Sequence, residues 1–559
     1  MRAATGRGCR IIHDIEIPMR DGVKLHTSVY LPPEEGSYPT VLVRSAYNRL
    51  FSFDVSFPTN GMALVVQDCR GRYDSEGEFY PFIHEAEDGY DTIEWVDRQP
   101  WCDGNIGMFG NSYLAGTQFA LAQTGSKYLK ALNPCFMSGD YWKQAYYSNG
   151  AFSLGLTWSW LCLEVASRVS HAANMPLMNV MDILRTLPLI ELDQVSGAGC
   201  VPSYRDYVTR SRYDVVWERL SLRNRYHHFD MPVLLIGGWY DYYPSETAAN
   251  FLGMREHAPS PKIRDSHRMI IGPWMHGMSS STTLGELDFG EDSLTQNDAT
   301  LRWLECILKG KEASEFQAAP VSIFVMGLNR WRDENEWPLA RTHYVNYYLR
   351  GDGELTRRTP QTADAPDRYV YDPADPVPTT GGNHSIGPYN PGLYEHAMPG
   401  PFDQRAVEAR PDVLVYTSDV LERDTEVTGP VTVRLFASSS ALDTDFVARL
   451  TDVYPDGRSI NITEGVLRAK FREDVWGEPK LLEPGNVYEL AIELQITSNV
   501  FMAGHRIRVD ITSSNFPLWD RNLNTGDDPG TGTEWLSAEQ TIYHDASRPS
   551  HIVLPIIET

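Results

Sequence analysis

Ser112 lies in the stretch GMFGNSYLAGTQF (107–119), where a short apolar run ends and a run with helical spacing begins. Small residues around a serine allow a tight strand-to-helix turn, and such a turn holds a nucleophilic hydroxyl exposed. The amino terminus of that helix would also leave the backbone N–H of Tyr113 free to bind an oxyanion. The match to Gly-x-Ser-x-Gly is incomplete, because Leu114 occupies the fifth position. Taken alone, the stretch fits an ordinary loop serine equally well.

An acidic and a basic residue follow Ser112 at matching places in the chain. Asp241 comes directly after VLLIGGWY and His276 directly after RMIIGPWM, each beyond the carboxyl end of a predicted strand. The carboxyl ends of parallel strands meet at one edge of a sheet, so we expect the three side chains to lie together. The carboxylate would then orient the imidazole, and the imidazole would take the proton of the serine.

Other histidines and aspartates fit this arrangement less well. They precede the serine in the chain, or they lie before or at the start of their strands: His84, His227, His228, His267, Asp230 and Asp265. A single Asp or His after a strand is more often a turn or surface residue. The assignment therefore depends on the combination of chain order and strand end.

The surrounding elements predict a layered α/β sheet with an insertion. Apolar runs at 39–47 and 62–71 indicate buried parallel strands, and residues 85–99 indicate a helix with an acidic start. From about 140 to 228 the sequence is aromatic and helical, and the strand pattern then returns at 230–243. Such a helical block is most simply a cap over the carboxyl edge of the sheet.

The last part of the chain changes character again. From about residue 340 it is rich in Pro, Gly, Thr and Val, with period-two runs such as VTVRLFASS (431–439). This pattern predicts a β-sandwich. The expected organisation is an α/β core in two parts, 1–139 and 230–339, a helical cap at 140–229, and an all-β domain at 340–559.

Composition excludes several classes of function. The 49 basic and 74 acidic residues give a formal charge of −25, which disfavours binding to nucleic acid or to an anionic membrane. Seven scattered cysteines without CxxC spacing argue against a disulfide framework and against a zinc site. No apolar run approaches the length of a membrane span, and the first residues do not form a signal peptide. We therefore expect a cytoplasmic protein.

Five motifs carry a resemblance to a known family. IPMRDGVKLHTSVYLP, QDCRGRYDSEGEF, QPWCDGNIGMFGNSYLAGTQ, GGWYDYY and GPWMHG closely resemble the CocE/NonD hydrolases, over roughly residues 11–330. The β-rich remainder is similar in length and character to the jelly-roll domain of that family. The resemblance implies an α/β-hydrolase core with an inserted helical cap and a C-terminal all-β jelly-roll domain.

The resemblance also implies roles for particular residues. Ser112, Asp241 and His276 match the catalytic triad. The oxyanion hole would consist of the Tyr113 backbone N–H and the hydroxyl of Tyr47, which spacing alone would leave as an ordinary loop tyrosine.

Further positions match the family less closely. Tyr243 resembles a position that lines the acyl side of the substrate. Trp158 and Trp160 in the cap are candidates for contact with the acyl group, or else belong to the core of the cap. The family usually has glycine at Ala115 and a larger residue at Gly116, and it commonly has proline at Ala46, so the loop that carries Tyr47 could be looser here.

The expected function is that of a serine hydrolase that cleaves carboxylic esters of small molecules with bulky or aromatic acyl groups. It would form an acyl-enzyme intermediate and need neither metal nor cofactor. The close alternative is an amidase, an acylase or an aminopeptidase that uses the same triad, such as an α-amino-acid ester hydrolase, a cephalosporin acylase or an Xaa-Pro dipeptidyl-peptidase. A non-catalytic ligand-binding protein is the more distant alternative. The oligomeric state stays open, a homodimer included.

Overall fold

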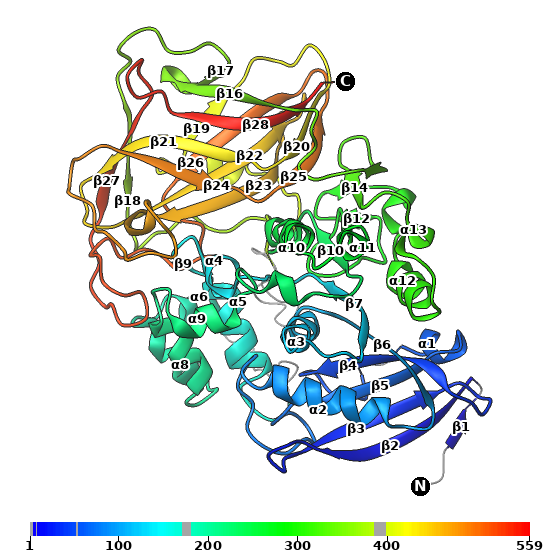
Figure 1. The fold of residues 1–559 in the computed structure, drawn as a ribbon. Coiled ribbons are helices and arrows are strands. Elements are labelled where there is room, and N and C mark those ends of the chain that lie inside the picture. Colours follow the sequence, from blue (N-terminus) through cyan, green and yellow to red (C-terminus); the bar gives the residue numbers. More distant parts are fainter. Residues whose placement is uncertain (1–3, 7, 52–53, 170–179, 385–397, 559) are drawn as a thin grey trace.

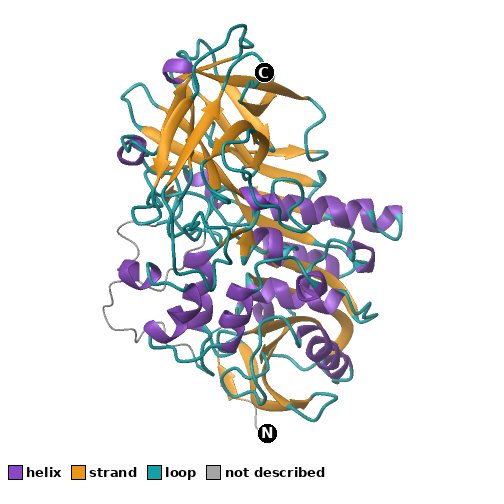
Figure 2. Cartoon of the chain, turned by 90° about the vertical axis from the view of Figure 1, so that its left-hand side faces the viewer, coloured by secondary structure: helices purple, strands orange, loops and turns teal. Residues whose placement is uncertain are grey.

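The computed structural model describes residues 4–6, 8–51, 54–169, 180–384 and 398–558, and Figure 1 shows its two large sheets. An eleven-stranded sheet forms the amino-terminal part of the molecule, and a thirteen-stranded sheet forms the carboxyl-terminal part. Figures 1 and 2 both place the β-rich domain at one end of the molecule and the amino terminus at the opposite end.

The first sheet is mixed, with a parallel centre. Its spatial order is β1 (Ala4–Gly6), β2 (Cys9–Pro18), β3 (Lys24–Leu31), β5 (Ala63–Asp68), β4 (Tyr38–Ser45), β6 (Cys102–Asn111), β7 (Leu129–Cys135), β10 (Leu234–Gly238), β11 (Arg268–Gly272), β14 (Val321–Val325) and β15 (Arg330–Glu334). The strands from β5 to β14 run parallel, while the outer pairs are antiparallel. The apolar runs of β5, β10, β11 and β14 are buried along their whole length, as expected for strands covered on both faces.

Helices cover both faces of this sheet. On β4, Val41 and Val43 belong to an apolar cluster with Trp303 of α12 (Ala299–Leu308), whereas Leu42 belongs to a cluster with Phe119 of α3 (Tyr113–Ala122). Alternate side chains of one strand point to opposite faces, so α12 and α3 lie on opposite sides of the sheet. The predicted helix at 85–99 is α2 (Glu85–Asp97), which packs against α3.

The segment predicted as a helical cap is helical in short pieces. It comprises α4 (Tyr141–Gln144), α5 (Leu154–Trp158), a π-helical turn (Ser159–Glu164), α6 (Val180–Leu184), α7 (Leu192–Val195), α8 (Pro202–Thr209) and α9 (Val215–Leu220). The prediction of an uninterrupted helical pattern from Tyr141 onward is wrong, because β8 (Tyr147–Ser148) and β9 (Ala151–Phe152) form a small hairpin. Asn149 and Gly150 turn this hairpin with φ values of 43° and 90°. An Asn-Gly pair favours such a turn over a helix.

The carboxyl-terminal domain is the predicted β-domain. Its strands are β16 (Thr342–Arg350), β17 (Glu354–Thr356), β18 (Asp367–Tyr371), β19 (Leu414–Thr417), β20 (Thr425–Gly429), β21 (Thr432–Ser439), β22 (Asp445–Val453), β23 (Ser459–Arg468), β24 (Tyr488–Glu493), β25 (Thr497–Phe501), β26 (Arg506–Thr512), β27 (Ala538–Tyr543) and β28 (His551–Ile557). They enclose an apolar core of their own. The other α-helices and strands are α1 (Ser56–Thr59), α10 (Pro244–Glu256), α11 (Pro261–Arg264), β12 (Thr283–Leu284), β13 (Leu287–Asp288), α13 (Ala313–Phe316) and α15 (Arg405–Glu408).

The β-domain packs directly on the helical segment. The indole N–H of Trp142 donates to the carbonyl oxygen of Val475 at 2.7 Å, and the indole N–H of Trp476 donates to Asp140 at 2.9 Å. At Gly150 a Cβ atom would lie 2.2 Å from the ring of Phe471, so only glycine allows this approach. The β-domain therefore supports the segment that covers the sheet. Among the described residues, no helix has the length and apolar character needed to span a bilayer.

Candidate active site

The predicted site residues lie at one edge of the parallel sheet. Tyr47 follows β4, Ser112 follows β6, Asp241 follows β10 and His276 follows β11, each beyond the carboxyl end of its strand. These strands and β7 are consecutive neighbours in the sheet. The expectation that the strand ends gather these residues at one edge is confirmed.

Ser112 is held on a strained turn. Its φ of 56° and ψ of −123° lie in a region that non-glycine residues rarely adopt, a cost of about 1–3 kcal/mol that is typical of functional sites. Its backbone N–H donates to the carbonyl oxygen of Cys135 at 2.9 Å. The turn also needs Gly110, where a Cβ atom would lie 2.3 Å from that of Leu114. The turn from strand to helix predicted around Ser112 is thus present.

Asp241 and His276 are joined directly. His276 Nδ1 and Asp241 Oδ1 lie 2.7 Å apart, with the aspartate fully buried and the histidine a quarter exposed. In the part of the chain that the structure describes, Asp241 Oδ2 has no hydrogen-bond partner. A buried carboxylate on one imidazole nitrogen fixes the ring and stabilises its protonated form.

The loops that carry this pair cross each other closely. The N–H of Trp239 donates to Gly272 at 2.8 Å, and the N–H of Tyr240 donates to Trp274 at 3.0 Å. At Gly238 a Cβ atom would lie 2.2 Å from the backbone oxygen of Trp274. Glycine at the end of β10 is therefore required for the two loops to meet.

Tyr47 and Tyr113 have different surroundings. The indole N–H of Trp160 donates to the Tyr47 hydroxyl oxygen at 3.0 Å, so the hydroxyl hydrogen of Tyr47 is directed away from the indole. The Tyr113 hydroxyl donates to Glu85 at 2.6 Å and accepts from the N–H of Phe82 at 3.2 Å. Burial, reinforced by the neighbouring Glu85 carboxylate, holds the pKa of Tyr113 far above its usual range. The Tyr113 side chain is thus fixed in the core by its hydroxyl.

Arg49 anchors the loop that carries Tyr47. Its backbone N–H and one guanidinium nitrogen each contact the buried carboxylate of Asp68 at 2.6 Å. The guanidinium also reaches Asp74 at 2.6 Å and Asp14 at 2.7 Å. The loop is therefore fixed without the proline that the family commonly has at position 46.

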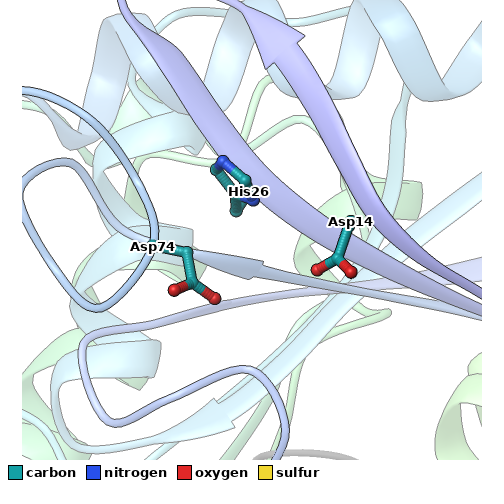
Figure 3. Close-up of side chains that lie close together, drawn as sticks. All are labelled: Asp14, His26 and Asp74. Carbon is teal, nitrogen blue, oxygen red and sulfur yellow. The ribbon is translucent and has the colours of Figure 1, made fainter.

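Asp14, Asp74 and His26 lie close together beside this anchor (Figure 3). Their possible ligand atoms are within 4.8 Å of one another, a spacing that metal sites also have. Here both carboxylates are already paired with the Arg49 guanidinium, which supplies the compensating positive charge. The two carboxylates are therefore accounted for as part of the loop anchor.

An apolar pocket lies between the predicted site residues and the helical segment. Its volume is about 40 Å³, and the described residues that line it include no charged side chain. They are Phe82, Met137, Tyr141, Ala145, Tyr146, Leu156, Thr157, Trp160 and Tyr243. The Tyr243 ring is 5.7 Å from the His276 ring, and Trp160 contacts the Tyr47 hydroxyl. We refer to it below as the acyl pocket.

Trp158 does not line the acyl pocket. Its side chain is fully buried in the core of the helical segment. Residues two positions apart on a helical turn face different sides, so Trp158 and Trp160 cannot share one face. Of the two predicted tryptophans, only Trp160 reaches the pocket.

The structure also accounts for the histidines that sequence order excluded. His267 is fully buried, and burial lowers its pKa to about 3, so it stays neutral in the core. His84 and His227 are exposed to solvent.

The main residues lining the acyl pocket that sequence reasoning missed are Phe82 and Tyr141, whose positions depend on long-range packing.

We expect Arg49→Gln to lower both the melting temperature and kcat. Removing one partner of a buried ion pair costs about 3–5 kcal/mol, here for Asp68, and the Tyr47 loop would lose its anchor. Arg20→Gln is the matched control, since Arg20 makes a bidentate pair with Asp91 while remaining half exposed, and such pairs contribute about 0–1 kcal/mol. Thermal denaturation and ester turnover measure both effects. Equal melting temperatures for the two variants would contradict the anchoring role.

Comparisons with known proteins agree with this architecture. Residues 21–278 match the X-Pro dipeptidyl-peptidase (S15 family) model, and residues 314–553 match the X-Pro dipeptidyl-peptidase C-terminal non-catalytic domain. The chain is 36% identical to a cocaine esterase from Rhodococcus sp. (strain MB1 Bresler), over 98% of this chain and 99% of the relative.

Solved structures show the same fold. An aminopeptidase from the marine sediment archaeon Thaumarchaeota archaeon superposes with a TM-score of 0.86 at 27% identity, covering 99% of this chain and 97% of its own. An α-amino acid ester hydrolase superposes with a TM-score of 0.84 at 24% identity, covering 100% and 98%. The chain has an α/β-hydrolase core and a C-terminal β-domain, and it matches a cocaine esterase over nearly its full length; it belongs to the CocE/NonD family of serine hydrolases.

Proposed function

We propose that this protein hydrolyses carboxylic esters through an acyl-enzyme intermediate on Ser112, with His276 as base and Asp241 as the orienting carboxylate. The observation that carries the proposal is the hydrogen bond of 2.7 Å between Asp241 and His276, at the sheet edge where the strained turn of Ser112 also lies. The similarity to a cocaine esterase over nearly the whole chain supports an ester substrate.

The mechanism assigns one task to each group. Ser112 Oγ attacks the ester carbonyl while His276 Nε2 takes its proton, and Asp241 stabilises the imidazolium. The backbone N–H of Tyr113 and the hydroxyl of Tyr47 donate to the oxyanion. His276 then gives the proton to the leaving alcohol. A water molecule activated by the same imidazole releases the acid from Ser112.

The acyl pocket favours an uncharged acyl group. Its lining is aromatic and aliphatic, and its polar groups are hydroxyls and one indole N–H. A short or flat apolar acyl group would gain hydrophobic and ring contacts there, whereas a buried ammonium would find no carboxylate among the described lining residues.

A peptide or amide substrate is the second candidate. It is favoured by the S15 match and by the archaeal aminopeptidase of the same fold. The uncharged lining of the acyl pocket argues for esters of neutral acids as the main substrates.

Labelling with a fluorophosphonate tests the nucleophile. We expect the intact protein to be labelled, and we expect Ser112→Ala to lose both labelling and ester hydrolysis. Ser280→Ala is the matched control, because Ser280 is exposed and lies near His276 in the chain. Both activities should be retained in this control. Labelling that persists in folded Ser112→Ala would rule out the proposed nucleophile.

A double-mutant cycle tests the oxyanion role of Tyr47. Loss of one oxyanion donor lowers kcat by about 100- to 1000-fold, and we expect this for Tyr47→Phe. Trp160→Phe removes the N–H that orients the hydroxyl, so it should lower kcat in the parent. In the Tyr47→Phe background the same change should have little further effect on kcat. Independent, multiplicative effects on kcat would contradict a role of Trp160 through Tyr47.

A further inference from the structure

A second cavity lies directly behind the acyl pocket. Its volume is about 150 Å³, against about 40 Å³ for the acyl pocket, and the two share Phe82 and Tyr141 as lining residues. The remaining lining residues of this rear cavity are Ile83, Ala86, Glu87, Gly116, Phe119, Ala120, Gln123, Thr124, Arg219, Leu220 and Arg225. Its lining thus combines apolar residues with charged ones, among them Glu87, Arg219 and Arg225.

The Phe82 ring is held in place on several sides. It stacks on Tyr113 with ring centroids 4.5 Å apart, and its centroid is 4.6 Å from that of Tyr141. Its backbone has a φ of 63°, which is unfavourable for a residue with an aromatic side chain. Its N–H donates to the Tyr113 hydroxyl. These contacts maintain a strained backbone beside the proposed oxyanion hole.

Gly116 is the surface on which this ring rests. A Cβ atom at Gly116 would lie 2.5 Å from Cε1 of Phe82 and 2.8 Å from the hydroxyl oxygen of Tyr141. The unusual order of Ala115 and Gly116 after the serine therefore has a physical reason. Because α3 has no side chain at position 116, the Phe82 ring can pack against the helix and close the pocket.

We infer that Phe82, resting on Gly116, is a specificity-determining residue that limits the length of the acyl chain. This inference rests on the proposed ester hydrolysis at Ser112. The ring is a partition one side chain thick between the acyl pocket and the rear cavity. Short acyl groups end against it, and longer linear chains are excluded from the space behind it. The substrates are accordingly esters of short or compact acids.

The test compares Phe82→Ala with the parent on p-nitrophenyl acetate, butanoate and octanoate. The readout is the ratio of kcat/KM for octanoate to that for butanoate. Each additional buried methylene is worth about a fourfold change in binding, so opening the rear cavity should raise this ratio about tenfold or more. Ile83→Ala is the matched control, because Ile83 lines the rear cavity but not the acyl pocket. Its ratio should equal that of the parent.

A second variant and a second measurement keep the test decisive. If Phe82→Ala does not fold, Phe82→Leu replaces it and should shift the ratio in the same direction. The rates of inactivation by p-nitrophenyl esters of butylphosphonate and octylphosphonate, whose P-alkyl chains occupy the acyl position, report the same preference without a deacylation step. If ester hydrolysis is lost in Ser112→Ala, an unchanged chain-length preference in folded Phe82→Ala or Phe82→Leu would overturn the role of Phe82 as a partition. Ester hydrolysis that is retained in the Ser112→Ala variant would instead overturn the proposed function.

Discussion

The proposed chemistry depends on the close crossing of the two loops that follow β10 and β11. Asp241 and His276 come within 2.7 Å because the first loop donates backbone hydrogen bonds to the second, and because Gly238 has no side chain at their contact. A fully buried carboxylate can then act on one imidazole nitrogen in surroundings of low dielectric, where its orienting effect is strong. The strained turn of Ser112 and the Arg49 anchor hold the other groups at the same sheet edge.

The helical segment contributes side chains at this sheet edge, and the β-domain holds that segment in place. The Trp160 indole donates a hydrogen bond to the Tyr47 hydroxyl, while Trp142 and Asp140 of the same segment form hydrogen bonds with the β-domain. The β-domain therefore contributes to the site indirectly, by holding the segment that forms the acyl pocket. The Phe82 ring divides the space beneath that segment, so acyl specificity would be set where core, cap and the Ser112 helix meet.

Much of this arrangement could be predicted because it is encoded locally. Apolar runs that end in Gly and polar residues mark the strand ends, so the sequence could place Ser112, Asp241 and His276 at one edge of the sheet. The hairpin at Asn149 and Gly150 was missed because its aromatic residues suit a helical core equally well. The difference between Trp158 and Trp160, and the role of Phe82, depend on contacts between distant segments, which no local pattern contains.

The central claim is that the acyl group passes through Ser112, and mass spectrometry of the rapidly quenched enzyme tests it most directly. With an activated ester whose deacylation is slow, the account predicts a peptide containing Ser112 that is heavier by one acyl group. This adduct should form within the first turnover and decay as acid is released. An adduct on another residue, or a burst of product without an adduct on Ser112, would contradict the account.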